Sequence, residues 1–182
     1  MAVPEASLEQ TDAGLAPGSD GWFVVNAREA QWFDRGPRGL ICRFDGDGEL
    51  EFSQLGFHLF VLGPGEPMSM YHWEADEEAF LVLSGEALLL VEGEERPLRA
   101  WDFMHCPPRA DHTIVGAGEG KSVIIAVGAR VDSTGPNWGG YPVHDVAVRR
   151  NASAQRDTTD PEEAYARFPA RRPARYEESW LP

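Results

Sequence analysis

Short apolar runs separated by Gly, Pro and acidic residues recur along the chain from about Leu40 to Val127. Each run has four to six residues, rich in Leu, β-branched or aromatic side chains, which is typical of strands in an all-β sandwich or barrel. The expected strands are Leu40–Phe44, Phe57–Leu62, Met68–Trp73, Ala79–Leu83, Ala87–Val91, Asp102–Cys106, His112–Val115 and Ser122–Val127, with a further candidate at Tyr141–Val148.

The segment before this region has a different pattern. Residues 1–21 are rich in Ala, Gly, Pro and acidic residues, so we expect a disordered N-terminal segment. Asn26 followed by Glu29 is a capping-box pattern, which predicts a short helix through Trp32. Residues 22–148 are then expected to form the single barrel domain.

Residues 149–182 are expected to form a helical C-terminal arm. Asp160 followed by Pro161 gives an N-cap and a proline at the first helical position, which predicts a short helix over about 161–168. Residues 149–175 contain seven arginines and four acidic residues, in a chain whose net charge is −14. A basic arm beside an acidic body suggests that the arm docks on its own body or on a partner's. A solvated tail is the alternative.

Composition excludes some partners. The chain has 182 residues, enough for one ordinary domain, and its acidic charge repels phosphate backbones, so no nucleic acid is expected. No apolar run has the length of a membrane span, and residues 1–20 lack the features of a secretory signal. We therefore expect no membrane partner and a cytoplasmic location, where Cys42 and Cys106 are reduced thiols.

The candidate chemistry is a group of histidines and carboxylates. His72 and Glu74 are two positions apart, so on a strand they project from the same face. Glu78 follows an acidic turn and returns beside them, and His112 arrives from another strand pair. Imidazole and carboxylate are the usual protein ligands of Zn, Fe and Mn. We therefore predict one divalent ion held by His72, Glu74, Glu78 and His112.

The spacing of these residues resembles two sequence motifs of the cupin superfamily. The first motif runs Gly, His-x-His, Glu and Gly, and the chain supplies Gly65, His72, Glu74 in place of the second His, Glu78, and Gly85. The second motif runs Gly, Pro-x-Gly, His and Asn. Here the chain supplies Trp101 for the first Gly, Pro107, Arg109 for the second Gly, His112, and Gly116 for the Asn.

The resemblance covers about Leu55 to Val127 and implies a double-stranded β-helix, or jelly-roll, barrel with a metal near its centre, usually as a homodimer. The ion would be Zn, Mn or Fe. His72, Glu78 and His112 match the family's metal ligands, whereas Glu74 replaces an imidazole. If Glu74 binds, the ion lies in a nearly filled cage; if it turns away, two His and one carboxylate form an open triad.

The resemblance also implies a metal-dependent enzyme that acts on a small polar metabolite, as a dioxygenase, an isomerase or epimerase, or a decarboxylase. The alternative is a non-catalytic module that binds a small ligand, with a structural or ligand-orienting metal. A metal-free scaffold whose acidic turn is merely solvated is the third hypothesis. An open coordination position would favour catalysis, and a closed tetrahedron a structural ion.

Other residues are secondary candidates for the site. His58 and His105 lie in predicted strands and are candidate acid–base groups, although a strand histidine is often structural. Met70, Phe80 and Phe103 are candidates for lining the cavity, although most strand aromatics belong to a core.

Overall fold

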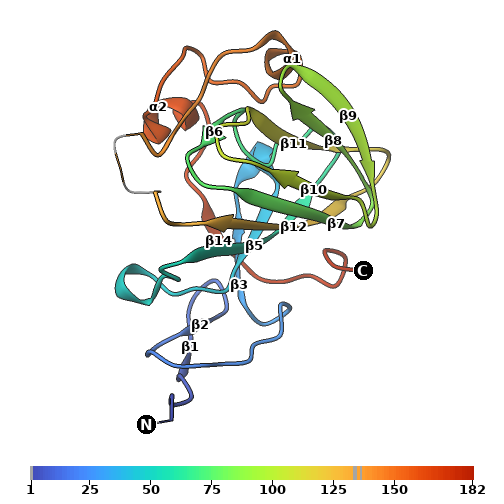
Figure 1. The fold of residues 1–182 in the computed structure, drawn as a ribbon. Helices are drawn as coiled ribbons and strands as arrows, with labels where there is room; N and C mark the ends of the chain where they lie inside the picture. Colours follow the sequence, from blue (N-terminus) through green and yellow to red (C-terminus); the bar gives the residue numbers. More distant parts are fainter. Residues whose placement is uncertain (1, 133–134, 136) are drawn as a thin grey trace.

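A computed structural model describes residues 2–132, 135 and 137–182 of the chain. The body is a barrel in which a seven-stranded antiparallel sheet faces a three-stranded one (Figure 1). The larger sheet has the order β10-β7-β12-β5-β4-β3-β14, and the smaller has the order β11-β8-β9. The strands of the larger sheet are β3 (Gln31–Asp34), β4 (Leu40–Arg43), β5 (Leu55–Leu62), β7 (Glu78–Ser84), β10 (Phe103–Cys106), β12 (Ser122–Ala129) and β14 (Arg172–Ala174). Those of the smaller sheet are β8 (Glu86–Val91), β9 (Glu94–Arg99) and β11 (His112–Ala117).

The core lies between the two sheets. Phe60 and Ile124 point inward from the larger sheet, and Leu89 and Ile114 meet them from the smaller one. Each such side chain, once buried, stabilises the fold by roughly 1.5–3 kcal/mol. The apolar alternation of the sequence thus produces a barrel closed on its apolar faces.

The segment expected as the strand Met68–Trp73 contacts the smaller sheet only at isolated points. His72 bridges His112, and Met68 N donates to Ile114 O at 2.8 Å. Between them, Met70 N donates to the Tyr165 hydroxyl at 3.1 Å and Tyr71 N to Ala152 O at 2.6 Å. The C-terminal arm thus takes the hydrogen bonds that a regular strand would make. Only β6 (Trp73–Glu74) is a strand here, and it pairs with β13 (Gly139–Gly140).

The N-terminal segment differs from the expected disorder. It forms a hairpin of β1 (Leu8–Gln10) and β2 (Leu15–Pro17), which extends away from the body (Figure 1). Leu15 N donates to Glu29 O at 2.7 Å, which ties the hairpin to the chain that precedes β3.

The short helix predicted through Trp32 is not formed. The Asn26 side chain does accept a hydrogen bond, from Arg28 N at 2.9 Å, but it closes only a turn. Gln31 and Trp32 then enter β3 and pair with β4. Burial of Trp32 in the sheet outweighs the weak local preference for a helix.

The C-terminal part contains two short helices, α1 (Asp145–Val148) and α2 (Pro161–Tyr165). α1 replaces the strand expected over Tyr141–Val148, because the His144 side chain caps a helix by accepting from Val146 N. In α2, the Asp160 carboxylate accepts from Glu162 N at 2.9 Å. The arm as a whole is not helical, since α2 has five residues and the rest of residues 149–182 is turns, loops and β14.

The arm packs against its own barrel. β14 extends the larger sheet beside β3, and Trp180 contacts Trp32 with ring centroids 5.1 Å apart. Arg150 forms an ion pair with Glu95 at 2.6 Å. Two 3₁₀ turns, η1 (Gly36–Arg38) and η2 (Gly48–Leu50), connect β3 to β4 and β4 to β5. Across the described ranges, we find no helix with the length and apolar character needed to span a bilayer.

Candidate metal centre

Three predicted ligands converge at one end of the barrel. His72 and His112 lie opposite each other across an isolated bridge, with ring centroids 4.8 Å apart. Glu78, the first residue of β7, reaches both: its Oε2 lies 3.1 Å from His112 Nε2 and 3.8 Å from His72 Nε2. One ligand atom from each of the three residues lies within 4.8 Å of the others. This spacing is suited to a single ion between them.

The hydrogen bonds of the two imidazoles turn their Nε2 atoms toward this point. His72 Nδ1 lies 2.8 Å from Met70 O, and His112 Nδ1 lies 3.0 Å from Ala110 O. A carbonyl oxygen only accepts, so each Nδ1 carries the proton. In the neutral tautomer each Nε2 then presents a lone pair toward Glu78. A backbone carbonyl that orients a ligating imidazole in this way is a common feature of metal sites.

Two ligand atoms have no hydrogen-bond partner. Glu78 Oε2 and His112 Nε2 are both buried, and neither makes a hydrogen bond of acceptable geometry with the described residues. A buried polar atom without a partner costs about 1–3 kcal/mol. A cation between them would satisfy both, so these residues fit a divalent metal ion.

Charge coupling supports the same reading. Burial opposes ionisation of Glu78, but its contacts with His112 and His72 lower the pKa of the carboxyl overall. Burial also disfavours a charged His112, yet Cys106 and Glu78 together raise its pKa. Without a metal, a proton on His112 therefore neutralises Glu78. A divalent cation would take the place of that proton.

Glu74 lies at the margin of the group. Its Oε1 is 3.4 Å from His72 Nε2, and its side chain is more exposed than that of Glu78. It is not one of the three residues whose ligand atoms all lie within 4.8 Å of one another. Whether Glu74 binds the ion therefore stays a prediction.

A cavity of about 400 Å³ opens on these residues. The residues that line it include His72, Glu74, Glu78, His58 and Phe80. Burial lowers the pKa of His58 to about 4, helped by nearby arginines and opposed by Asp45, so this side chain is neutral at physiological pH. The cavity has the size of a site for a small metabolite.

The other secondary candidates lie outside the cavity. Met70 is fully buried but packs with Tyr141 and the arm residues Ala154 and Ala164. Phe103 and His105 face outward, because side chains alternate along β10 and Met104 and Cys106 take the inward positions. His105 pairs there with exposed Glu77, at 3.4 Å.

Several residues at the site had no signal in the sequence. Cys106 places its Sγ 3.1 Å from His112 Nδ1, which packs the thiol against a candidate ligand. Tyr141 stacks on His72 with ring centroids 5.8 Å apart, and burial raises the pKa of its hydroxyl. The sequence predicted Tyr141 only as the first residue of a strand over Tyr141–Val148, whereas in the structure it forms an isolated bridge with Thr158.

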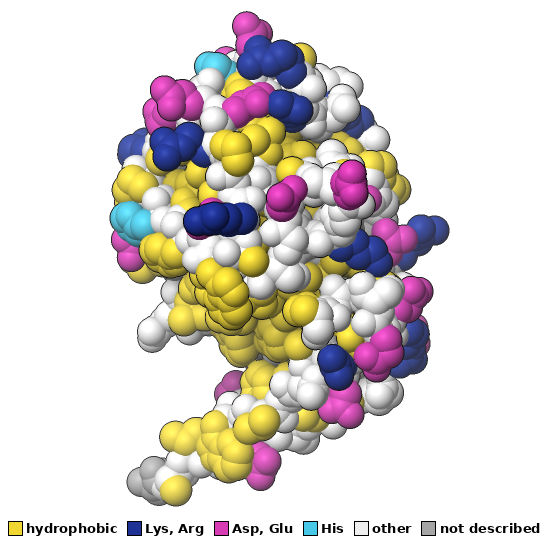
Figure 2. Space-filling view, turned by 90° about the vertical axis from the view of Figure 1, so that its right-hand side faces the viewer, with side chains coloured by type: hydrophobic (Ala, Val, Ile, Leu, Met, Phe, Trp, Pro, Cys, Tyr) yellow, Lys and Arg dark blue, Asp and Glu magenta, His cyan; other side chains and the backbone are white. Residues whose placement is uncertain are grey.

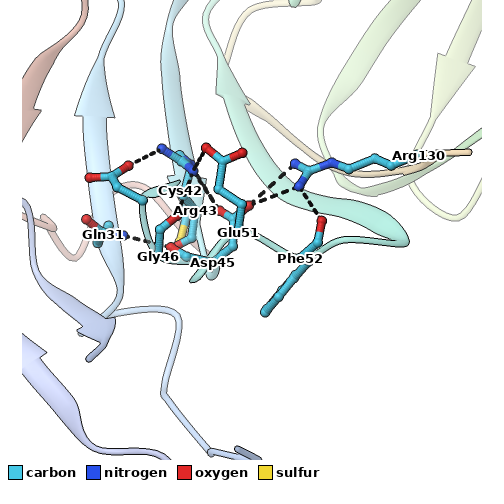
Figure 3. A network of polar contacts seen from close by, with 9 residues as sticks. Gln31, Cys42, Arg43, Asp45, Gly46, Glu51, Phe52 and Arg130 are labelled. Carbon is cyan, nitrogen blue, oxygen red and sulfur yellow. Dashed lines mark hydrogen bonds and ion pairs between the residues drawn. The ribbon is translucent and has the colours of Figure 1, made fainter. Parts of the chain in front are cut away.

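A polar network next to the cavity fixes one arginine of its wall (Figure 3). Asp45 is 1% exposed and accepts from Arg43 Nε at 3.0 Å. On its other side, Arg130 lies 3.4 Å from Asp45 Oδ2 and donates to Phe52 O at 2.6 Å. Arg130 lines the cavity, and its charge is balanced by the Asp45 carboxylate.

The backbone explains two departures from the motif glycines. Trp101 and Arg109 occupy positions expected to be Gly, and they have φ angles of 75° and 70°. Both therefore adopt the left-handed conformation that glycine takes without strain. Motif glycine Gly85 has φ 75°, and a Cβ there would lie 2.4 Å from Lys121 O. The turns at Trp101 and Arg109 thus keep the backbone conformation of the motif although the glycines are replaced.

Two antiparallel sheets that enclose a His/His/Glu group at one end of a barrel define a small double-stranded β-helix protein with a site of metal-binding type. The family model for the cupin domain matches residues 58–128. This range contains all four predicted ligands and both motifs. Residues 58–128 of the chain thus form a domain of the cupin superfamily.

Several solved structures are similar to the chain. One, from Acidithiobacillus ferrooxidans, is provisionally described as a sugar phosphate isomerase; it is 30% identical, with a TM-score of 0.46 over 53% of this chain and 63% of that one. A sugar phosphate isomerase of the cupin superfamily from Silicibacter pomeroyi is 26% identical, with a TM-score of 0.45 over 50% of this chain and 59% of that one. This chain thus spans less than two thirds of either relative.

A predicted oxalate decarboxylase from Thermotoga maritima is 19% identical and has a TM-score of 0.51, over 58% of this chain and 97% of that one. At this identity the likeness concerns the fold alone. No curated protein matches the chain.

Proposed function

We propose that this protein is a metal-dependent cupin enzyme that holds one divalent ion through His72, Glu78 and His112 and acts on a small polar metabolite. The observation that carries the proposal is the pair of buried ligand atoms, Glu78 Oε2 and His112 Nε2, which lie 3.1 Å apart without a hydrogen bond of acceptable geometry, beside a cavity of about 400 Å³. Structural sites are usually closed by four protein ligands, whereas catalytic sites keep an open position. Three ligands beside a cavity support catalysis.

Glu74 is proposed as a fourth ligand that is recruited when the ion binds. Its carboxylate lies 3.4 Å from His72 Nε2 and lines the same cavity. With Glu74 bound, two carboxylates neutralise a divalent ion, which favours Mn or Fe at least as well as Zn. Without it, the two His and one carboxylate have the composition of a facial triad with open positions.

The bound ion would polarise a carboxylate, enediol or keto acid of the substrate. The chain's own residues orient the ligands and limit the access of water. Met70 O and Ala110 O hold the two imidazoles, and Tyr141 packs against His72. Neutral His58 is the candidate proton acceptor on the cavity wall. Isomerisation or epimerisation, decarboxylation and dioxygenation are all compatible with this arrangement.

We also propose that the protein works as a homodimer in the cytoplasm. The two thiols, Cys42 and Cys106, are buried and unpaired, which suits a reducing compartment. Apolar side chains gather on the face shown in Figure 2, and such areas often mark interfaces. Light scattering during size-exclusion chromatography tests the dimer, and an elution mass of about 20 kDa, that of one chain, would argue against it.

Metal analysis of protein made without a histidine tag tests the proposed function. We expect close to one equivalent of a divalent metal in the wild-type protein and almost none in His112→Ala. His105→Ala is the matched control, since His105 is exposed on the outer face. Equal metal content in the two variants would contradict the assignment of His112. Wild-type protein that stays metal-free after incubation with Mn²⁺, Fe²⁺ or Zn²⁺ would contradict the proposal as a whole.

A further inference from the structure

Two arginines share the cavity with the candidate metal ligands and have no carboxylate partner. Arg35 directly precedes η1, the turn between β3 and β4, Arg38 is the last residue of that turn, and both line the cavity. Among the residues that the structure describes, neither forms an ion pair within 4 Å. Both precede the segment 58–128 that the cupin family model matches, so they are features of this chain rather than of the motif.

Arg35 is held in place by neutral groups. It is 5% exposed; its Nη1 donates to Met68 O at 2.7 Å and its Nη2 donates to Arg38 O. The guanidinium lies over the ring of Phe60, 4.7 Å from the centroid. Burial, together with the like charge of Arg38, lowers the pKa of Arg35 to about 9. These contacts orient the cation without neutralising it.

Arg38 has even fewer polar contacts. Its guanidinium stacks 4.5 Å from the ring centroid of Tyr165 and 5.4 Å from that of Phe168. Its Nε is buried and makes no hydrogen bond with the described part of the chain. Burial lowers the pKa of this side chain as well. The arm residues thus provide an aromatic wall that positions a second cation toward the cavity.

Unlike Arg35 and Arg38, Arg130 has a carboxylate in ion-pair contact. Arg130 lines the same cavity, but the buried Asp45 carboxylate balances its charge (Figure 3). Glu74 and Glu78 would balance a divalent ion in the same way. Arg35 and Arg38 then leave the cavity with an excess of positive charge, which Glu66, beyond ion-pair distance, offsets only in part at Arg35. Uncompensated buried cations are costly, so a site built this way is suited to an anion that arrives with the ligand.

We propose that the cavity binds a small anionic metabolite whose carboxylate or phosphate group is held by Arg35 and Arg38, with the rest of the molecule directed toward His72 and Glu78. Guanidinium groups bind the oxygens of both kinds of anion with paired, charge-assisted hydrogen bonds. The proposal rests on the proposed function only in placing the other end of the metabolite at the metal ligands; the anion site at Arg35 and Arg38 does not depend on a bound metal.

Calorimetric titration with inorganic phosphate and with succinate tests the proposal. We expect wild-type protein to bind at least one of these probes, and Arg38→Gln to bind it at least about tenfold more weakly, because the variant loses a charge-assisted hydrogen bond to the anion. Arg38→Lys should retain part of the affinity. Arg96→Gln is the matched control, since Arg96 is exposed on β9 and forms no ion pair with the described residues. Tighter binding of phosphate or of succinate identifies which anion the site prefers.

The same titration on His112→Ala separates this inference from the metal assignment. Anion binding that persists in His112→Ala and is lost in Arg38→Gln supports the arginine site even if no metal binds. Binding that is unchanged in Arg38→Gln, or absent for both probes in the wild-type protein, overturns it. Arg35 is more deeply buried, so its role is followed in the folded wild-type protein through the ¹H–¹⁵N signal of its Nε–H, which should shift on adding the anion.

Discussion

Glu78→Gln is the most direct test of the metal centre, because it removes the carboxylate charge while it preserves the shape of the side chain. Glu78 Oε2 lies 3.1 Å from His112 Nε2 and 3.8 Å from His72 Nε2, so it is the residue that joins the two imidazoles. Without its charge, the remaining histidines offer no anionic ligand, unless Glu74 moves in. We therefore expect affinity for a divalent ion to fall at least about 100-fold.

The effect can be measured as a change in thermal stability. A ligand that binds only the folded state at 100 times its Kd stabilises that state by about 2.7 kcal/mol. For a chain of this length, 1 kcal/mol corresponds to about 2–4 °C in Tm, so saturating metal should raise the wild-type Tm by roughly 5–11 °C. Glu78→Gln at the same metal concentration should show a shift of less than about 2 °C.

Each protein is melted after EDTA treatment and again after addition of Mn²⁺, Fe²⁺ or Zn²⁺. This pairing matters because Glu78→Gln also breaks the contact with His112 in the metal-free protein and lowers its Tm. Glu77→Gln is the control, since Glu77 is exposed and pairs with His105 outside the cavity. A metal-induced shift in Glu78→Gln equal to that of Glu77→Gln would refute the role assigned to Glu78.

Three further predictions concern the frame of the site. Trp180→Ala should cost about 3–5 kcal/mol in unfolding free energy by chemical denaturation, because Trp180 is 7% exposed and packs on Trp32; a loss below 1 kcal/mol would contradict docking of the arm. The pKa of His58 is about 4 in the folded protein and 6.5 in the unfolded one, so as the pH falls the unfolded state binds the proton first, and the unfolding free energy should fall by up to about 3 kcal/mol from pH 6.5 to pH 4. In melts of the metal-free protein, His58→Gln should reduce this loss. A pH profile that is the same in the variant and the wild type would refute the prediction. Trp101→Gly should raise stability by up to about 1 kcal/mol in thermal melts, because a strained φ of 75° is relieved at an exposed side chain, whereas Trp101→Ala should give no such gain.

The central strands were predictable because each contains a short apolar run. β5, β7, β8, β10, β11 and β12 each overlap an apolar run bounded by turn residues. β9 gave no signal, since Glu94–Arg99 is an exposed, charged strand at the edge of the smaller sheet and contains Pro97. The N-terminal helix was wrong because a capping pattern reports only local preference. Trp32 stabilises the protein more as part of a buried sheet than as the end of one helical turn.

The candidate site also has features that the sequence predicts and features that it does not. His72, Glu78 and His112 were predicted because they match the metal ligands of two cupin motifs, whereas Glu74 was predicted from its position two residues after His72 on a strand. The orientation of the two imidazoles was not predictable, because it depends on the carbonyls of Met70 and Ala110. Phe103 and His105 were expected to face the cavity but lie on the outer face of β10. Because successive side chains of a strand point to opposite faces, a shift of one residue moves every side chain to the other face.

Arg35 and Arg38 show most clearly where sequence reasoning ends. A motif can identify residues that bind an ion, but an unpartnered cation is a property of what surrounds it in three dimensions. The sequence contains 30 acidic residues, so two arginines that form no ion pair within 4 Å among the described residues are unexpected by composition. Arg43 and Arg130 follow that composition and share Asp45. The fold brings Asp45 to one arginine of the cavity wall and leaves two others against aromatic rings. This arrangement favours a substrate that supplies the missing negative charge. The specificity of the site would then reside in η1, the turn between β3 and β4, and in the C-terminal arm, outside the motifs that define the family.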